Sequence, residues 1–317
     1  MALSIDVAGT GLTVLDRVYT DERRSFEALG GSCGNVLVSL AMLDHMVTPV
    51  LRLGYDDVGA SLVAEFASAG ADTTYIFRRA DVASPVIAQR LDTSSGQHSF
   101  SFICPETDKN FPQYCSIDEA DVESAKDAFG ACSIFYSDRV SEPILQAMAA
   151  AFSAGALIYF EPSTVEDEAL FQRALGYASI VKFSSDRLDL HTAKKAFRPT
   201  AISIVTHGSD GLEVHQDDKR IACQAKPAAI VRDACGAGDM VTVGLIDWIL
   251  NRRSDDTGLS VEQLLPGVFA GQRLAACNCA FPGARGIFQH RGAKFARSVL
   301  EDDVGDSLLQ FDLFEDL

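Results

Sequence analysis

The stretch RDACGAGDM, residues 232–240, stands directly before the apolar run VTVGLIDWIL, residues 241–250. Small residues let a backbone come close to a ligand, and the first turn of a helix presents unpaired N–H groups with a partial positive charge. These residues therefore predict an anion site where a buried helix begins. A carboxylate beside a bound anion is repelled unless it accepts a proton, so Asp239 indicates a phosphoryl-transfer site.

The composition is typical of an ordinary globular chain. It has 317 residues, 47% of them hydrophobic, and a formal net charge of −17. A chain of this size buries one large core or two modest ones. The acidic charge argues against nucleic acid and anionic membranes as partners, because both select clustered Lys and Arg. An anionic ligand would then be held by local amides and a metal.

The start of the chain and its cysteines bear on location. The N-terminus, MALSIDVAGTGL, has no basic segment followed by a long apolar one, and no apolar run reaches the ~18 residues that span a bilayer. Cysteines occur without a CxxC pair or a histidine at zinc spacing, at positions 33, 104, 115, 132, 223, 235, 277 and 279. We therefore expect a cytoplasmic protein with reduced thiols.

Apolar, β-rich segments alternate with helical patterns, which predicts parallel βαβ units. Strands are expected at 4–9, 47–54, 132–137, 156–162, 178–184 and 201–208, followed by two short strands around QDDK. Helices are expected at 33–43, 58–70, 142–155 and 260–281. Residues 83–103 differ, because two extended segments flank a TSSG turn and predict an antiparallel hairpin projecting from the main sheet.

The chain shows no internal repeat or linker, so we expect one α/β domain over residues 1–317. Strands from the N-terminal third would form a small second layer. The acidic tail EDDVGDSLLQFDLFEDL, residues 301–317, is expected to be a solvated terminal segment.

Three motifs carry a resemblance to a known family: GGSCGN (30–35), GYDDVG (54–59) and DACGAGD (233–239). Together, in this order and separation, they resemble the ribokinase-like (PfkB-type) carbohydrate and nucleoside kinases, and the likeness spans nearly the whole chain. It implies an α/β fold in which a central, mostly parallel β-sheet is flanked by helices on both faces. A small β-sheet lid would cover the sugar, with strands from residues 12–28 and 83–103.

The resemblance also implies ATP-dependent phosphorylation of a hydroxyl on a small sugar or sugar-like alcohol. Asp239 would act as the general base, because a sugar hydroxyl is a poor nucleophile until its proton is accepted. The amides of Gly236, Ala237 and Gly238 would form an anion hole for the transferred phosphoryl group. An acidic residue in the first turn of a helix can also simply cap the helix dipole.

Substrate residues follow from the same likeness. Asp16 matches the family carboxylate that binds sugar hydroxyls, and its two oxygens suit a vicinal diol. Gly30 and Gly31 would let the backbone approach the substrate. Asn35 would offer it a donor and an acceptor, or serve as a helix N-cap. Asp57 matches an acidic position near the lid hinge, although a simple turn role explains it equally well.

The nucleotide site is expected at THGSDG (206–211), which resembles the family's Thr-x-Gly-x-x-Gly loop after a strand. The predicted contacts are Thr206, Gly208, Gly211 and Asn278, the last corresponding to family residues near the adenine. Asp233 and the GARG turn (283–286) match loops that bind a monovalent cation such as K⁺ in many relatives.

Departures from the family pattern affect metal and substrate. The resemblance implies Mg²⁺, but the Asn-x-x-Glu motif associated with it is replaced by SSDR, residues 184–187. Either Asp186 replaces the missing carboxylate, or phosphates and water hold the metal. FEPST (160–164) lacks the Arg that the resemblance implies for hexose kinases, which argues against fructose and against a phosphorylated sugar as the substrate. Cys235 places a thiol beside the anion hole, as a small filler or as an oxidation-sensitive group.

Two other functions remain open from the sequence. A nucleoside kinase would need aromatic side chains that stack a base, for which Tyr19, Phe100 and Phe102 are candidates. A ligand-sensing relative without turnover is favoured by the altered SSDR stretch and opposed by the intact GAGD. A dinucleotide dehydrogenase is excluded, because GTG near the first strand lacks the later glycine of the fingerprint. Exposed edges of lid strands could also pair between subunits, so we expect a homodimer.

Overall fold

The computed structural model describes residues 4–20, 23–188, 197–252 and 259–301. Its main sheet contains, in spatial order, β14 (Lys219–Cys223), β13 (Leu212–Gln216), β12 (Ile202–Thr206), β11 (Ile180–Ser184), β10 (Leu157–Phe160), β9 (Cys132–Ser137), β1 (Ile5–Thr10) and β4 (Val47–Pro49). The strands from β4 to β12 are parallel, and β13 and β14 are antiparallel. The predicted mostly parallel central sheet is confirmed. The predicted acidic tail, beyond residue 301, lies outside the described residues.

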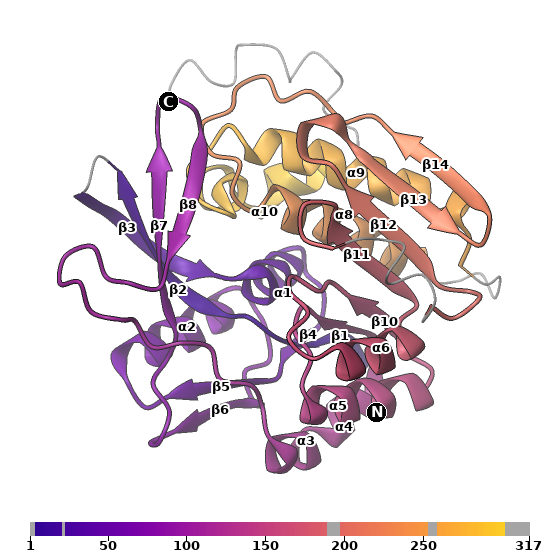
Figure 1. The fold of residues 1–317 in the computed structure, drawn as a ribbon, viewed down its shortest axis with the longest axis horizontal. Coiled ribbons are helices and arrows are strands. Elements are labelled where there is room, and N and C mark those ends of the chain that lie inside the picture. The colour runs from indigo at the N-terminus through magenta and orange to yellow at the C-terminus, as the bar shows by residue number, and fades with distance from the viewer. Residues whose placement is uncertain (1–3, 21–22, 189–196, 253–258, 302–317) are drawn as a thin grey trace.

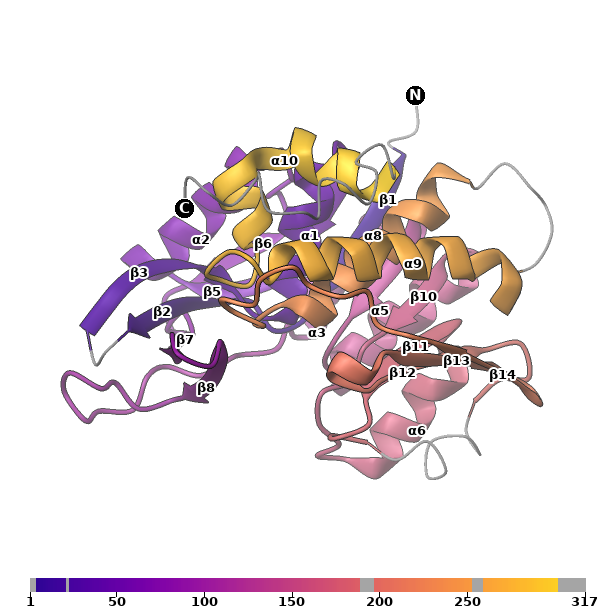
Figure 2. The ribbon, with the colours of Figure 1, turned by 90° about the horizontal axis from the view of Figure 1, so that it is seen from above.

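Helices cover both faces of this sheet. One core contains side chains from α1 (Ser32–Met42), α2 (Asp57–Ser68), α8 (Ala237–Asn251), α9 (Val261–Asn278) and α10 (Gly286–Glu301). The other contains side chains from α4 (Lys126–Ala131), α5 (Glu142–Ser153) and α6 (Glu168–Tyr177). Val7 and Ala8 are neighbours in β1 yet belong to opposite cores, because successive strand side chains point to opposite faces. Figure 2 shows α8 and α9 on one side of the sheet and α6 on the other.

A second, smaller sheet is built in the order β3 (Arg23–Gly30), β2 (Val14–Thr20), β7 (Val86–Asp92), β8 (Gln97–Ser101). β7 and β8 form the expected antiparallel hairpin, and its turn closes at Gly96, whose φ of 67° favours glycine. Figure 1 shows this small sheet on the left, separate from the main sheet. Its strands fall in the two predicted segments, except that β3 runs two residues further, to Gly30.

The single strand predicted at 47–54 is wrong. The chain forms β4 (Val47–Pro49) at the edge of the main sheet and then β5 (Leu51–Gly54), which pairs with β6 (Ile76–Arg79) in a separate two-stranded sheet. Pro49 explains the break, because proline has no N–H for a further ladder bond and is tolerated at the end of an edge strand. Continuous apolar sequence concealed the change of sheet.

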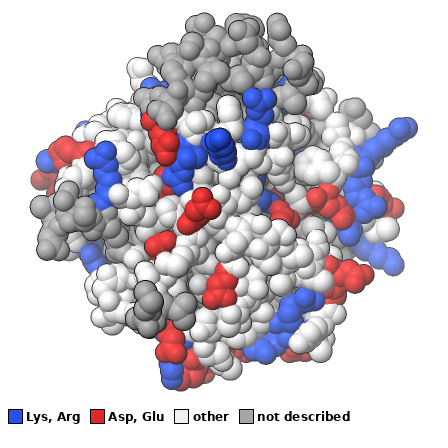
Figure 3. All heavy atoms as spheres, turned by 180° about the vertical axis from the view of Figure 1, so that it is seen from behind, with Lys and Arg blue, Asp and Glu red and all other residues white. Residues whose placement is uncertain are grey.

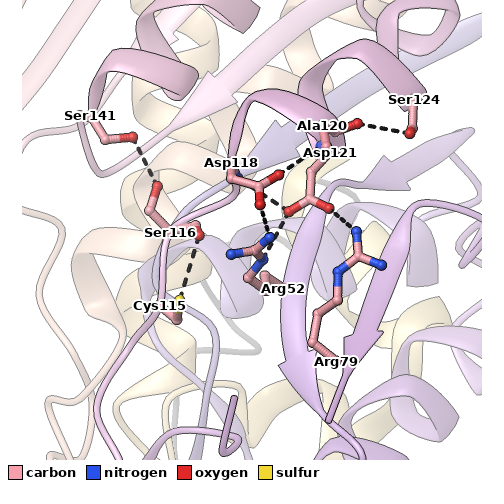
Figure 4. Close-up of polar contacts among 9 residues, drawn as sticks. All are labelled: Arg52, Arg79, Cys115, Ser116, Asp118, Ala120, Asp121, Ser124 and Ser141. Atoms are coloured by element: carbon pink, nitrogen blue, oxygen red, sulfur yellow. Dashed lines mark hydrogen bonds and ion pairs between the residues drawn. The ribbon is translucent and has the colours of Figure 1, made fainter. Parts of the chain in front are cut away.

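Buried ion pairs fasten the two-stranded sheet to α3 (Glu119–Ser124), a short helix that the sequence patterns did not predict. The Asp121 carboxylate is fully buried and pairs with Arg52 of β5 and Arg79 of β6. Asp118 caps the helix, receives the Asp121 N–H at 2.9 Å and also pairs with Arg52 (Figure 4). Because a buried carboxylate is costly without a partner, these arginines fix where β5 and β6 lie.

The surface carries the negative charge in a mixed pattern. On the face shown in Figure 3, Lys and Arg lie in separate small groups interspersed with Asp and Glu. Among the described residues, no helix is long and apolar enough to cross a membrane. All eight cysteines are free thiols.

Candidate active site

The anion site predicted from the opening stretch lies at the start of α8. Gly236 is the residue before the helix and has a φ of 73°. A Cβ on it would lie 2.2 Å from the Ala284 carbonyl oxygen, so both backbone angle and space require glycine. The Ala237 N–H donates to the Ala234 carbonyl oxygen at 3.3 Å. Of the three predicted amides, those of Gly236 and Gly238 are therefore the better placed to receive an anion.

Asp239 lies in the first turn of α8 and is 8% exposed. Its Oδ2 accepts a hydrogen bond of 2.7 Å from the Asn35 Nδ2 of α1. Burial and the nearby charge of Glu161 raise the Asp239 pKa, the Asn35 hydrogen bond and Lys182 lower it, and together they leave it at about 6. A carboxylate that is ionised at neutral pH yet titrates near it suits a general base.

The N-cap alternative for Asn35 is wrong, because α1 begins at Ser32 and its N-cap is Gly31. Asn35 is therefore inside the helix, 3% exposed, where it donates to Asp239. Its Oδ1 is buried and accepts no hydrogen bond from the described residues. A buried acceptor without a donor is costly, so this atom favours a ligand hydroxyl that supplies one.

Glu161 and Lys182 belong to the same site and were not predicted. Glu161 follows β10, and Lys182 in β11 is 2% exposed and forms an ion pair with it. The Lys182 Nζ is 3.7 Å from the position of a Cβ on Gly238, so its positive charge lies at the start of α8. Thr242 donates to Glu161 at 2.6 Å from the next turn of that helix. From the sequence alone, the motif FEPST stands out only for its missing arginine, whereas in the structure its glutamate, Glu161, contacts Lys182 and Thr242.

Asp16 lies in β2, between β3 and β7 of the small sheet, and is 6% exposed. Burial raises its pKa to about 7, Arg285 lowers it, and the charge of Asp239 raises it, which places the two carboxylates within electrostatic reach of one another. A Cβ on Gly30 would lie 1.9 Å from the Asp16 Oδ2, so Gly30 gives this carboxylate its room. Gly31 has a φ of 80°, and a Cβ on it would lie 2.4 Å from the Leu12 carbonyl oxygen.

Asp233 and Asn278 organise the loops beneath the anion site. The fully buried Asp233 carboxylate accepts N–H bonds of 2.8 Å from Cys235 and Gly283 and a longer one from Gln89 of β7. Asn278 is also fully buried and bonds three backbone groups, the Cys235 and Ala284 carbonyls and the Ile287 N–H. Asn278 therefore holds the loops in place, and its polar atoms face backbone.

The predicted nucleotide loop follows β12. Thr206 ends that strand, and Gly208 and Gly211 have φ values of 58° and 104°. A Cβ on Gly211 would lie 2.2 Å from the Cys223 carbonyl oxygen, so this turn requires glycine. Asp186, the proposed replacement for the missing family carboxylate, is exposed at the end of the adjacent strand β11.

A further carboxylate, Asp138, was not predicted. It follows β9, is 1% exposed and accepts the Leu12 N–H at 2.8 Å. Burial raises its pKa to about 6, and the charge of Arg139 lowers it. A Cβ on Gly11 would lie 1.8 Å from its Oδ1, so this contact explains the last glycine of the GTG stretch.

The remaining candidates are Asp57 and three aromatic side chains. Asp57 is exposed in the first turn of α2, where Asp56 supplies the cap by accepting the Gly59 N–H at 2.7 Å. Phe100 and Phe102 are about half exposed. Tyr19 is 1% exposed and packs in the core, so it offers no surface on which a base could stack.

Comparison with known proteins agrees with this arrangement. Residues 6–290 match the family described as pfkB family carbohydrate kinase. The chain belongs to the pfkB family of carbohydrate kinases. This kinase is 27% identical over 269 residues to the aminoimidazole riboside kinase of Salmonella typhimurium, covering 79% of this chain and 82% of that protein.

Solved structures similar to this kinase have the same fold. A fructokinase from Xylella fastidiosa with bound ATP is 22% identical, with a TM-score of 0.76 over 95% of this chain and 100% of the other. Ribokinase from Giardia lamblia is 13% identical, with a TM-score of 0.75 over 96% and 99%. The ribokinase-like fold expected from the three motifs is confirmed, and the enzyme is a phosphotransferase with an alcohol group as acceptor.

Proposed function

We propose that this kinase transfers the γ-phosphoryl group of ATP to a hydroxyl of a small sugar or sugar-like alcohol, with Asp239 as the general base. The observation that carries the proposal is the position of Asp239. It is buried at the start of α8, bonded to Asn35, with a pKa of about 6. The acceptor hydroxyl would lose its proton to Asp239 while attacking a phosphoryl group held by the Gly236 and Gly238 amides.

Lys182 adds a positive charge at the place where the transferred group would sit. Glu161 pairs with the Lys182 ammonium and holds it in place. Since this ammonium lies at the helix start, it would help neutralise the equatorial phosphoryl oxygens. The Asp16 carboxylate would accept hydrogen bonds from hydroxyls of the substrate, and the Asn35 Oδ1 would accept one from a further substrate hydroxyl. This division leaves Asp239 for the proton.

ATP would lie along the loop of Thr206, Gly208 and Gly211, whose glycine turns let phosphates approach the backbone. Mg²⁺ is usually held by one or two carboxylates, phosphate oxygens and water. Asp186 fits this role, because its exposed carboxylate stands next to the loop, at the end of β11. Glu161 fits it less well, since Lys182 and Thr242 already occupy its oxygens.

The K⁺ prediction stays a prediction. Asp233 ties the loop before α8 to the turn at residues 283–286, and loops so held present the carbonyl oxygens that a monovalent cation prefers. Its Oδ2 accepts two N–H bonds and its Oδ1 accepts one. The Asp233 side chain would hold these two loops together while their carbonyl oxygens bind the ion.

A nucleoside acceptor is the second candidate. The relative that favours it is the aminoimidazole riboside kinase, at 27% identity. With Tyr19 in the core, the exposed rings of Phe100 and Phe102 would be the ones to stack on a base. A homodimer through the edges of the small sheet also remains a proposal, and light scattering during size-exclusion chromatography tests it.

The test is ADP release from Mg-ATP across pentoses, hexoses, sugar acids, polyols and nucleosides. We expect turnover with one acceptor class, and that class names the substrate. No turnover with any acceptor, while ATP binds, would favour a ligand-sensing relative and contradict the proposal. Hydrogen exchange in β2, β3, β7 and β8 should also fall on acceptor binding, since lid closure excludes water. Unchanged exchange would overturn the lid assignment.

A further inference from the structure

Three side chains of different chemistry meet between the small sheet and the start of α8. His98 comes from β8, while Asp233 and Cys235 belong to the loop before the helix. One nitrogen, one carboxylate oxygen and the Cys235 sulfur all lie within 4.8 Å of one another. His98 is 135 residues from Asp233 in the sequence, so no motif spacing reveals this cluster.

The distance between His98 and Asp233 is close to that between two ligands of one metal ion. The His98 Nδ1 is 3.7 Å from the Asp233 Oδ1, too far for a hydrogen bond, and this buried nitrogen has no hydrogen-bond partner among the described residues. Zinc bonds of about 2.1 Å at a tetrahedral angle place nitrogen and oxygen ligands about 3.4 Å apart. Oδ1 accepts one N–H, from Cys235, which leaves it a lone pair.

We propose that His98, Asp233 and Cys235 form a binding site for a zinc-class divalent cation that bridges the small sheet and the anion-hole loop. Thiolate and imidazole ligands favour Zn²⁺, whereas Mg²⁺ and K⁺ prefer oxygen. On binding, the sulfur–metal bond replaces the S–H bond of Cys235, and the proton passes to solvent. A fourth position is left for water.

Charge and access both favour an ion at this place. The Cys235 sulfur is buried within 4.8 Å of an Asp233 carboxylate oxygen, so a thiolate there would face a negative charge. A divalent cation would relieve this repulsion of the thiolate. His98 also lines an open depression of about 380 Å³ on the small sheet, so one of the three proposed ligands adjoins solvent.

The bridge would act on turnover, a consequence that rests on the proposed function. The turn of the β7–β8 hairpin already touches the loop, where Ala234 donates to the Gly96 carbonyl oxygen at 3.3 Å. A metal bound by His98 of β8 and by Cys235 would keep the hairpin against this loop. It would also fix the position of Cys235, which precedes Gly236. Zn²⁺ would therefore slow lid opening and inhibit the kinase.

The test uses Co²⁺ as a spectroscopic substitute for Zn²⁺ on the full chain. We expect one Co²⁺ per chain to give a thiolate-to-cobalt charge-transfer band that Zn²⁺ removes. The band should vanish in Cys235→Ser, and Co²⁺ affinity should fall about 10-fold or more in His98→Gln. Two control variants, Cys115→Ser and His290→Gln, should keep both, because these residues lie outside the cluster.

Absence of the band in the wild-type chain, or its persistence in Cys235→Ser, would overturn the site. Circular dichroism and thermal unfolding check each fold, and His98→Gln decides if Cys235→Ser does not fold. Wild-type affinity in His98→Gln would also overturn it. Zn²⁺ should then slow ADP release by the wild type more than by His98→Gln. A normal band without this inhibition overturns only the proposed effect on turnover. If no acceptor supports turnover, the proposed function fails but the Co²⁺ result still tests the metal site.

Discussion

Asn35→Leu should move the acid limb of the kinase's pH profile. The Asn35 Nδ2 donates a 2.7 Å hydrogen bond to the ionised form of Asp239, whose pKa is about 6. A buried hydrogen bond to a charged group contributes about 1.5–3 kcal/mol, or about 1–2 pKa units at 1.36 kcal/mol each. Leucine has a similar size and no donor, so the Asp239 pKa should rise to about 7–8.

The assay is kcat at saturating acceptor between pH 5 and 9, because kcat/KM would also report the ionisation of Asp16, whose pKa is about 7. The wild-type rate should be lost as the pH falls through about 6, because protonated Asp239 cannot accept a proton. In Asn35→Leu the same loss should occur about 1–2 units higher, whatever the remaining maximum rate. Ser39→Ala, a buried residue one turn further along α1, should leave the limb in place. An unmoved limb in Asn35→Leu would refute the assignment of the limb to Asp239.

Three further changes test the supporting structure. Gly236→Ala should destabilise the protein by about 1–3 kcal/mol more than Gly155→Ala, because both have positive φ but only Gly236 lacks space for a Cβ; thermal unfolding measures this. Asp121→Asn should cost about 3 kcal/mol in urea unfolding by breaking the buried ion pairs, and a loss below about 1 kcal/mol contradicts that role. Lys182→Met should raise the pH of the acid limb by removing a positive charge that lowers the Asp239 pKa. A limb that stays or moves lower contradicts this, with Lys219→Met on the surface as control.

Much of the fold was accessible from sequence, because alternating β-rich and helical segments are local features. The strands at 132–137 and 202–206 and the helix at 261–278 lie inside or at the predicted ranges. The errors have local causes as well. Residues 47–54 read as one apolar strand although two different sheets share them, and α3 and α4 have six residues each, too few to show a helical period.

The site was less accessible, because its members come together only in the folded chain. Asp239 and Gly236 could be predicted, since a glycine-rich helix start leaves a local signal. Glu161 and Lys182 could not be predicted. Glu161 follows β10 and Lys182 lies in β11, and the two side chains pair only when these strands become neighbours. A signal was present in retrospect, as a lysine within the apolar run ASIVKFS is rarely buried without a partner.

The most direct test of the central claim compares Asp239→Asn with the wild type, measuring single-turnover phosphoryl transfer and, separately, binding of ATP and acceptor. If Asp239 accepts the proton, transfer should slow by about 10²–10⁴-fold while both dissociation constants change by only a few-fold. Transfer within about 10-fold of the wild-type rate would show that another group, or none, accepts the proton, and would contradict the account.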